Sequence, residues 1–186
     1  MSEADTLSNA LTGAEIARLR EMIEREAIYD NIVKYCRGQD RADLELLKDS
    51  YWEDGTDDHG QYVGSAHGFC EMSIDTRDMF RSVNHHIGNT QIEFIGDNQA
   101  KAETYFICVL VWADPDRTGE DVDWFLAGRY RDLHEKRNGE WKILRRVCIW
   151  DWNQEHPHLS NWSRGGIPDN SNWGKRSKDD PIYQAW

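Results

Sequence analysis

Two adjacent histidines, His85 and His86, open an apolar stretch that ends at Ile95, with no Cys-rich or basic residues around it. A histidine titrates near neutral pH and both accepts and donates protons. Side chains along a strand alternate between its two faces, so only one of the pair can point into a given cavity. A pair of histidines in this position therefore indicates a general base. For either histidine taken alone, a purely structural role is the alternative.

The residues after the pair do not decide which histidine faces inward. His86 would share its face with Ile92 and Phe94, so strict alternation around an apolar interior favours His86. A bulge at Gly88 would switch the faces and turn His85 inward instead. The periodicity therefore leaves both assignments open, an inward His85 and an inward His86.

Composition limits the classes of partner. The 186 residues suit one domain with an appended tail, and the formal net charge of -12 opposes binding to nucleic acid or to an anionic membrane surface. The chain has no apolar run of membrane length, and residues 1–10 lack the apolar segment of a signal peptide. We therefore expect a soluble, cytoplasmic protein.

Cysteines and tryptophans give two further expectations. Since no two cysteines have Cys-x-x-Cys spacing, we expect reduced core thiols at Cys36, Cys70, Cys108 and Cys148. The chain has nine tryptophans, of which five lie in its last part, at Trp150, Trp152, Trp162, Trp173 and Trp186. An aromatic-lined pocket or a buried subunit contact would use them.

Helical patterns dominate the first part of the chain. Apolar spacing and capping residues predict helices over about 13–37, from about 43 for a short length, and over about 65–80. Gly38 is expected to end the first helix, and Asp40 or Asp43 to cap the second. The turn-rich segment 54–64 predicts a hairpin.

Strand patterns follow the helices. They predict strands over about 87–95, 101–112, 124–136 and 141–152, with a two-residue turn at Asn138-Gly139. Helices followed by an antiparallel meander predict an α+β fold, in which a curved sheet wraps around a helix and leaves a pocket. We expect a flexible N-terminus over 1–12, one domain over 13–152, and an irregular, Trp-rich tail over 153–186 that packs on its own or a neighbouring subunit.

Short motifs are spread over about residues 14–152, namely Ile32–Tyr35 with Asp40 and Asp43, Asp58–Gly60 with Tyr62 and Gly64, His85–Asn89, Gly128–Asp132, Asn138–Ile143, Arg145-Arg146 and Asp151-Trp152. In their order and spacing they resemble the SnoaL-like branch of the nuclear-transport-factor-2-like superfamily. Members are cone-shaped α+β barrels, often trimers or dimers, so the resemblance implies a homo-oligomer, with a homotrimer as the first expectation.

The resemblance also implies a class of chemistry. Some members, such as scytalone dehydratase and hexachlorocyclohexane dehydrochlorinase, are lyases that use no cofactor and carry a His-Asp pair inside the cone. Others are isomerases, cyclases or non-catalytic subunits of ring-hydroxylating dioxygenases. By resemblance, no cofactor is expected here.

Catalytic residues follow by matching the motifs. His85 matches the catalytic histidine because it precedes x-Ile-Gly, and Asp40 matches the catalytic aspartate, with a helix cap as its structural alternative. Arg146 matches the cavity arginine of the dehydrochlorinase, with a solvated strand charge as its alternative. His59 stands where scytalone dehydratase has a tyrosine. That enzyme's second strand histidine has no counterpart in Tyr105–Leu110.

Aromatic and polar side chains near these motifs are the expected pocket wall. The expected substrate-binding residues are Tyr35, Trp52, Tyr62, His86, Tyr105 and Trp150. The groups Asp57–His59 and His156–His158 lack a third partner at metal-ligand spacing, so we predict no metal site.

Together these features predict a cofactor-independent lyase that acts on a hydrophobic aromatic or polycyclic small molecule, as in the catabolism of aromatic compounds. Release of an aldehyde such as formaldehyde from lignin-derived diaryl compounds and isomerisation are alternatives. A third alternative is a binding or scaffold subunit, whose cone would be filled. An open pocket at His85 would discriminate between enzyme and scaffold.

Overall fold

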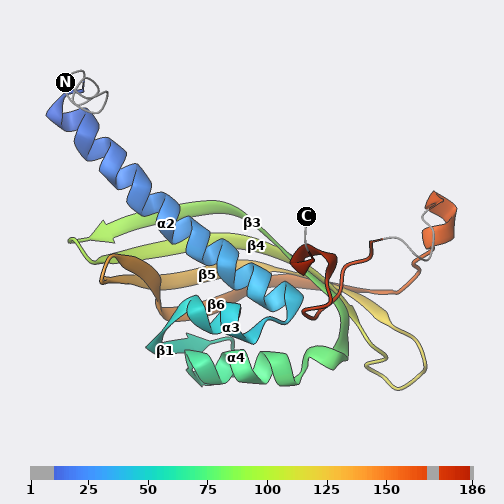
Figure 1. The fold of residues 1–186 in the computed structure, drawn as a ribbon. Helices are drawn as coiled ribbons and strands as arrows, with labels where there is room; N and C mark the ends of the chain where they lie inside the picture. Colours follow the sequence, from blue (N-terminus) through green and yellow to red (C-terminus); the bar gives the residue numbers. More distant parts are fainter. Residues whose placement is uncertain (1–10, 167–171, 185–186) are drawn as a thin grey trace.

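The computed structural model describes residues 11–166 and 172–184, apart from the side chains of residues 162 and 163. Most of the predicted flexible N-terminus, together with Trp186 and the Trp162 side chain, lies outside the described residues. Figure 1 shows a long helix lying across a curved sheet, with two shorter helices and a small hairpin beside it. No helix in the described part is long and apolar enough to cross a membrane.

The long helix, α2 (Gly13–Arg41), begins as the sequence predicts and ends later. The Thr12 hydroxyl accepts a hydrogen bond from the Glu15 N–H at 3.3 Å, and the Glu15 carboxylate accepts one from the Thr12 N–H at 2.7 Å. The predicted end before Gly38 is wrong. The helix continues to Arg41, and the left-handed residue that follows is Ala42, with φ of 50°.

Gly38 has a packing role instead of a terminating one. A Cβ on Gly38 would lie 2.8 Å from the Cα of Leu47 in helix α3 (Leu44–Asp49), so only glycine lets the two helices approach this closely. Asp43, not Asp40, caps α3 by accepting a hydrogen bond from the Leu46 N–H at 3.3 Å. The extension of α2 thus leaves Asp40 in its last turn, without a capping role.

Six strands form one curved, unclosed sheet in the order β2-β1-β6-β5-β4-β3. They are β1 (Tyr51–Asp58), β2 (Val63–Ser65), β3 (Phe80–Ile95), β4 (Gln99–Trp112), β5 (Val122–Arg137) and β6 (Glu140–Pro157). Neighbours are antiparallel except β1 and β6, which are parallel. β1 enters the sheet from a helix and not from a hairpin with β6, so no tight turn fixes its direction. The predicted α+β fold with a curved sheet around helices is confirmed, and the parallel pair is its one departure.

The connections largely follow the predicted turn chemistry. Asn138 and Gly139 have φ of 53° and 87°, as a two-residue hairpin turn requires. Helix α4 (Ala66–Asp75) is shorter than predicted, because a separate 3₁₀ turn, η1 (Arg77–Met79), precedes β3. β6 continues past its predicted end at Trp152.

A bulge in β3 changes which residues face the concave side of the sheet. Ile87 pairs with Phe106 and Thr90 pairs with Thr104, so β3 has one residue more than β4 over this interval. The bulge shifts the alternation of β3 by one residue. The argument from strict alternation, which favours His86, therefore fails. Before the bulge, the concave face receives His85.

Residues 172–184 of the tail lie against the C-terminal end of α2 (Figure 1). The Arg41 guanidinium donates to the Asp180 carboxylate at 3.1 Å, and the Tyr183 hydroxyl donates to the Asp43 carboxylate at 2.9 Å. These contacts lie within one chain. That a tail closes its own or a neighbour's pocket stays a prediction.

The main core lies between the helices and the concave face of the sheet, and it contains all four cysteines. They are buried and free, as predicted for core thiols. Burial raises the pKa of Cys36 to about 11 and that of Cys70 to about 12, so these thiols are poor nucleophiles at neutral pH.

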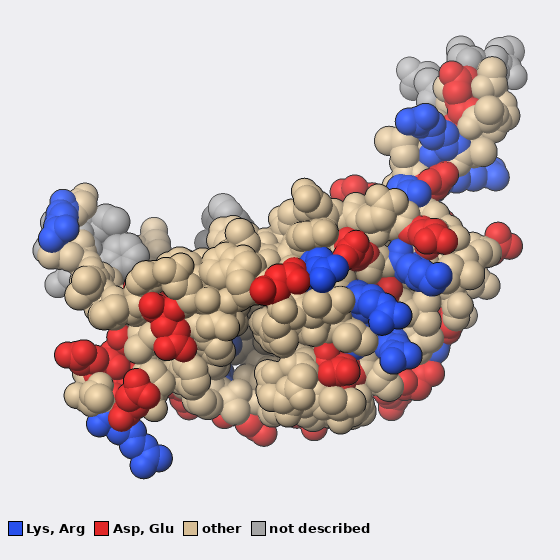
Figure 2. All heavy atoms as spheres, turned by 180° about the vertical axis from the view of Figure 1, so that it is seen from behind, with Lys and Arg blue, Asp and Glu red and all other residues tan. Residues whose placement is uncertain are grey.

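Charged side chains of both signs are interspersed on the face shown in Figure 2. Arg129 of β5, for example, pairs with Glu103 of β4 at 2.8 Å and with Asp151 of β6 at 3.0 Å. Exposed pairs of this kind contribute at most about 1 kcal/mol each. The fold therefore depends mainly on the buried layer, where the candidate site lies.

Candidate active site

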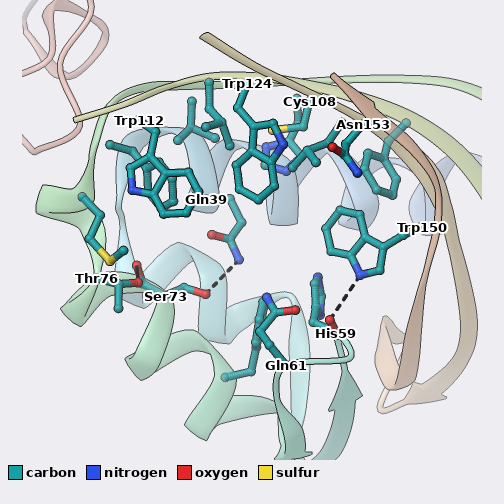
Figure 3. A pocket seen from close by; sticks show the side chains of 18 of the residues that line it. Gln39, His59, Gln61, Ser73, Thr76, Cys108, Trp112, Trp124, Trp150 and Asn153 are labelled. Carbon is teal, nitrogen blue, oxygen red and sulfur yellow. Dashed lines mark hydrogen bonds between the residues drawn. The ribbon is translucent and has the colours of Figure 1, made fainter. Parts of the chain in front are cut away.

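A cavity of about 650 Å³ lies between the concave face of the sheet and helices α2 and α4. Its lining is mostly aromatic and aliphatic, and four tryptophans contribute to it, namely Trp112, Trp124, Trp150 and Trp152. In Figure 3, Trp112 and Trp150 lie toward opposite ends of the cavity, and Gln39 reaches between them from α2. The volume is in the range of small-molecule sites.

His85 lines this cavity and is held by Asp40. The His85 Nδ1 and the Asp40 Oδ1 are 2.6 Å apart, and the His85 backbone N–H donates to both carboxylate oxygens at 3.1 and 3.0 Å. One carboxylate thus fixes both the ring and the backbone of the histidine. With Nδ1 engaged, Nε2 is the nitrogen left to exchange a proton with a ligand.

The surroundings of His85 alter its acidity. Burial lowers the pKa of the imidazole, but the Cys108 sulfur and the Asp40 carboxylate raise it more, so the pKa lies well above its usual value near 6.5. A carboxylate beside an imidazole stabilises the imidazolium that forms when the ring accepts a proton. His85 is therefore a stronger base than a free histidine.

A second His-Asp pair contributes His59 to the lining of the same cavity. The ring of His59 stacks on Phe69 with centroids 4.0 Å apart, and its Nδ1 contacts the Asp57 carboxylate, which also accepts a hydrogen bond from the Tyr51 hydroxyl at 2.6 Å. The Tyr35 hydroxyl lies 3.3 Å from His59 Nε2. His59 is thus oriented by a carboxylate, as His85 is, and the carboxylate of Asp57 is buried.

Arg146 does not reach the cavity, contrary to the expectation from the dehydrochlorinase motif. Its side chain is fully buried and donates to the Asp132 carboxylate at 2.8 and 2.7 Å. Its guanidinium also lies 4.0 and 3.9 Å from the ring centroids of Tyr35 and Tyr130. Burial raises the pKa of Asp132, but Arg146 lowers it more, to about 2. Arg146 therefore packs behind the tyrosines that line the cavity and does not itself line it.

The structure places only part of the predicted pocket wall at the cavity. Tyr35 and Trp150 line it, and the Trp150 indole donates to the His59 carbonyl at 3.2 Å. Four predicted substrate-binding residues do not line it, namely Trp52, Tyr62, His86 and Tyr105.

Each of these four has another place in the fold. His86 and Tyr105 are exposed on the convex side of the sheet, which the bulge in β3 explains for His86. The Trp52 indole donates to the Glu135 carbonyl at 2.8 Å, and the Tyr62 hydroxyl donates to the Ser65 carbonyl at 2.9 Å.

Three residues that line the cavity or orient its lining were not predicted as part of the site. Asp57 was considered only as a metal ligand, although its position two residues before His59 on one strand face is a usable signal. Gln39 donates to the Tyr35 hydroxyl at 3.3 Å, one helical turn away. Arg176 comes from the irregular tail, where no periodicity places it. Within residues 11–166 and 172–184, no three His, Cys, Asp or Glu side chains are grouped to hold a metal ion.

A family model described as a SnoaL-like domain matches residues 20–147. The chain belongs to the SnoaL-like family. No curated protein sequence matches it significantly.

Solved structures of similar fold include two with assigned chemistry. A provisionally named scytalone dehydratase from Novosphingobium aromaticivorans is 21% identical, with a TM-score of 0.64 over 75% of this chain and 91% of that chain. The hexachlorocyclohexane dehydrochlorinase LinA-type3 from Novosphingobium barchaimii is 16% identical, with a TM-score of 0.65 over 77% and 96%. A protein of unknown function from Mycobacterium tuberculosis is 20% identical, with a TM-score of 0.58 over 71% and 74%. At these identities the likeness establishes the fold alone.

Proposed function

We propose that this SnoaL-like protein is a cofactor-independent lyase for a hydrophobic, aromatic or polycyclic small molecule. The observation that carries the proposal is the 2.6 Å contact between His85 and Asp40 beside a cavity of about 650 Å³. An oriented base next to a largely apolar cavity fits proton abstraction from a substrate that is shielded from water.

The base step uses His85. The neutral imidazole removes a proton from the substrate through Nε2, and the electrons of the broken C–H bond form a double bond as the leaving group departs with its own bonding pair. Asp40 stabilises the imidazolium that results, and this charge-assisted hydrogen bond is stronger than a neutral one.

His59 and Tyr35 support departure of the leaving group. Both line the cavity, and Asp57 orients the His59 ring. A hydroxide leaving group takes a proton from the hydrogen-bonded pair of Tyr35 and His59 as it departs, whereas a halide needs only a hydrogen-bond donor. The sequence-based expectation gives this role to Arg146 together with His59 or a tyrosine, but the Arg146 guanidinium is committed to Asp132 and is left out of the proposed mechanism.

The same residues suit two related reactions. In the first, deprotonation of a substrate hydroxyl would form a carbonyl and break the adjacent C–C bond, which releases formaldehyde while the electron pair of that bond forms the new double bond and the leaving group departs. In the second, return of the proton to another carbon would give an isomerase. The open cavity at His85 supports an enzyme over the scaffold alternative, in which side chains would fill the cone.

The test is a screen of aromatic alcohols and aryl-substituted halides, followed by ultraviolet absorbance of the conjugated product. With a substrate in hand, His85→Gln should lower kcat by about 100-fold or more, the usual contribution of a general base. His86→Gln is the matched control, since His86 is the next residue and is exposed on the opposite face. A His85→Gln protein that keeps its circular dichroism spectrum and its activity would refute the proposal.

A further inference from the structure

Among the described residues that follow β6, Arg176 is the one that lines the cavity. It lies in residues 172–184, which the Arg41 to Asp180 contact at 3.1 Å fastens to the end of α2. The tail thus carries a guanidinium back to the site from far along the sequence.

Two hydrogen bonds fix the guanidinium between separate elements. Its Nη1 donates to the Arg77 carbonyl of η1 at 2.8 Å, and its Nη2 donates to the Gln39 carbonyl of α2 at 3.1 Å. Both acceptors are neutral. The Nε of Arg176 is buried and has no hydrogen-bond partner. A buried donor without a partner is rare in native proteins and calls for an acceptor.

The charges around the cavity do not supply that acceptor. Among the described residues that line the cavity, Arg176 is the one fixed cation, and none is Asp or Glu. The nearby Asp40 carboxylate is engaged by His85, and the Asp180 carboxylate is engaged by Arg41. The site therefore carries an uncompensated positive charge, in a protein whose formal net charge is -12.

Flat aromatic surfaces lie beside Arg176. Its guanidinium is 5.9 Å from the ring centroid of Phe80, which lies 5.8 Å from the ring of Trp112. Trp112 in turn stacks on Trp124 with centroids 5.0 Å apart. This aromatic wall can hold the face or edge of a planar ring.

We propose that the cavity binds aromatic carboxylates, with the carboxylate on Arg176 and the ring against the wall formed by Phe80, Trp112 and Trp124. This names the substrate class of the proposed lyase and rests on that function for turnover, whereas binding itself is independent of it. The proposal makes Arg176 the specificity-determining residue, since an arginine binds a carboxylate through directed N–H donors.

The test compares two ligands that differ in one charge, 2-naphthoate and its neutral analogue 2-naphthamide, by quenching of tryptophan fluorescence at neutral pH in the full chain. The wild-type protein should bind the naphthoate about ten-fold or more tightly than the amide. Arg176→Gln should reduce this preference to about one-fold while the affinity for the amide stays the same. Lys175→Gln removes the same charge from the exposed neighbouring residue and should keep the preference.

Three results would overturn the assignment. The first is a wild-type protein without preference for the naphthoate. The second is an Arg176→Gln protein that keeps the preference while His85→Gln loses it, because the carboxylate would then lie on the imidazolium. The third is an Arg176→Gln protein whose affinity for both ligands falls equally, which would mean that Arg176 only keeps the tail in place. Since the readout is binding, failure of the lyase proposal would leave these outcomes unchanged.

Discussion

At the scale of single residues, the site consists of two histidines, each oriented by its own aspartate. His85 pairs with Asp40 from the helix layer, whereas His59 pairs with Asp57 from the end of β1, the strand that precedes it. Two such pairs around one cavity allow one imidazole to accept a proton while the other donates one. This division of roles suits the proposed elimination when the leaving group is hydroxide.

Arg146 belongs to stability and not to the reaction. Replacing it with alanine leaves the Asp132 carboxylate buried without its partner, so Arg146→Ala should lower the free energy of unfolding by about 3–5 kcal/mol. Arg145→Ala is the matched control, because Arg145 is exposed and should change stability by less than about 0.5 kcal/mol. Urea denaturation measures both. A stable Arg146→Ala protein that had lost only activity would return Arg146 to the catalytic set.

The motif match predicts that His85 and Asp40 lie together, and it also predicts that Arg146 faces the cavity. Facing inward is not the same as lining the cavity, because Asp132 and two tyrosine rings fill the space in front of Arg146. Such filling depends on long-range packing, which strand periodicity does not contain. Arg176 was beyond prediction for a similar reason, since its segment is irregular.

At the scale of elements, the last turn of α2 determines where Asp40 lies and brings it into contact with His85. The capping box at Thr12 and the helix itself are predicted correctly from the sequence, but the predicted end of the helix at Gly38 is wrong. The prediction failed because Gly38 is required by the packing of α3. The extra turn carries Asp40 to His85, and the bulge at Gly88 turns His85 to meet it.

The two glycines of α2 test this account. Gly38→Ala should lower the free energy of unfolding by about 1–3 kcal/mol, because the new methyl group would overlap the Leu47 backbone. Gly13→Ala is the control, since nothing lies within 4 Å of its Cβ position, and should change stability by less than about 0.5 kcal/mol. Thermal or urea unfolding of both variants gives the comparison. Equal stability of the two would mean that Gly38 has no packing role.

At the scale of the whole molecule, the SnoaL-like fold brings three separate parts of the chain to one cavity. The helix layer supplies Asp40, the sheet supplies His85 and His59, and the tail supplies Arg176. The fold class followed from the order of elements, because helices before an antiparallel meander leave few arrangements. The assembly of the site did not follow, since it depends on where a helix ends and where a tail returns.

The measurement that tests the central claim most directly is the pH dependence of kcat/KM in wild-type and Asp40→Asn proteins. The neutral form of His85 is the base, so activity should rise with pH through a pKa above 6.5, where Asp40 holds the imidazolium. In Asp40→Asn this midpoint should move to lower pH, and the plateau should fall by about 100-fold because the imidazolium loses its partner. Asp30→Asn, which removes an exposed carboxylate from the same helix, should leave the profile unchanged. An Asp40→Asn protein with the wild-type midpoint and plateau would contradict the pairing of His85 with Asp40 as the catalytic base.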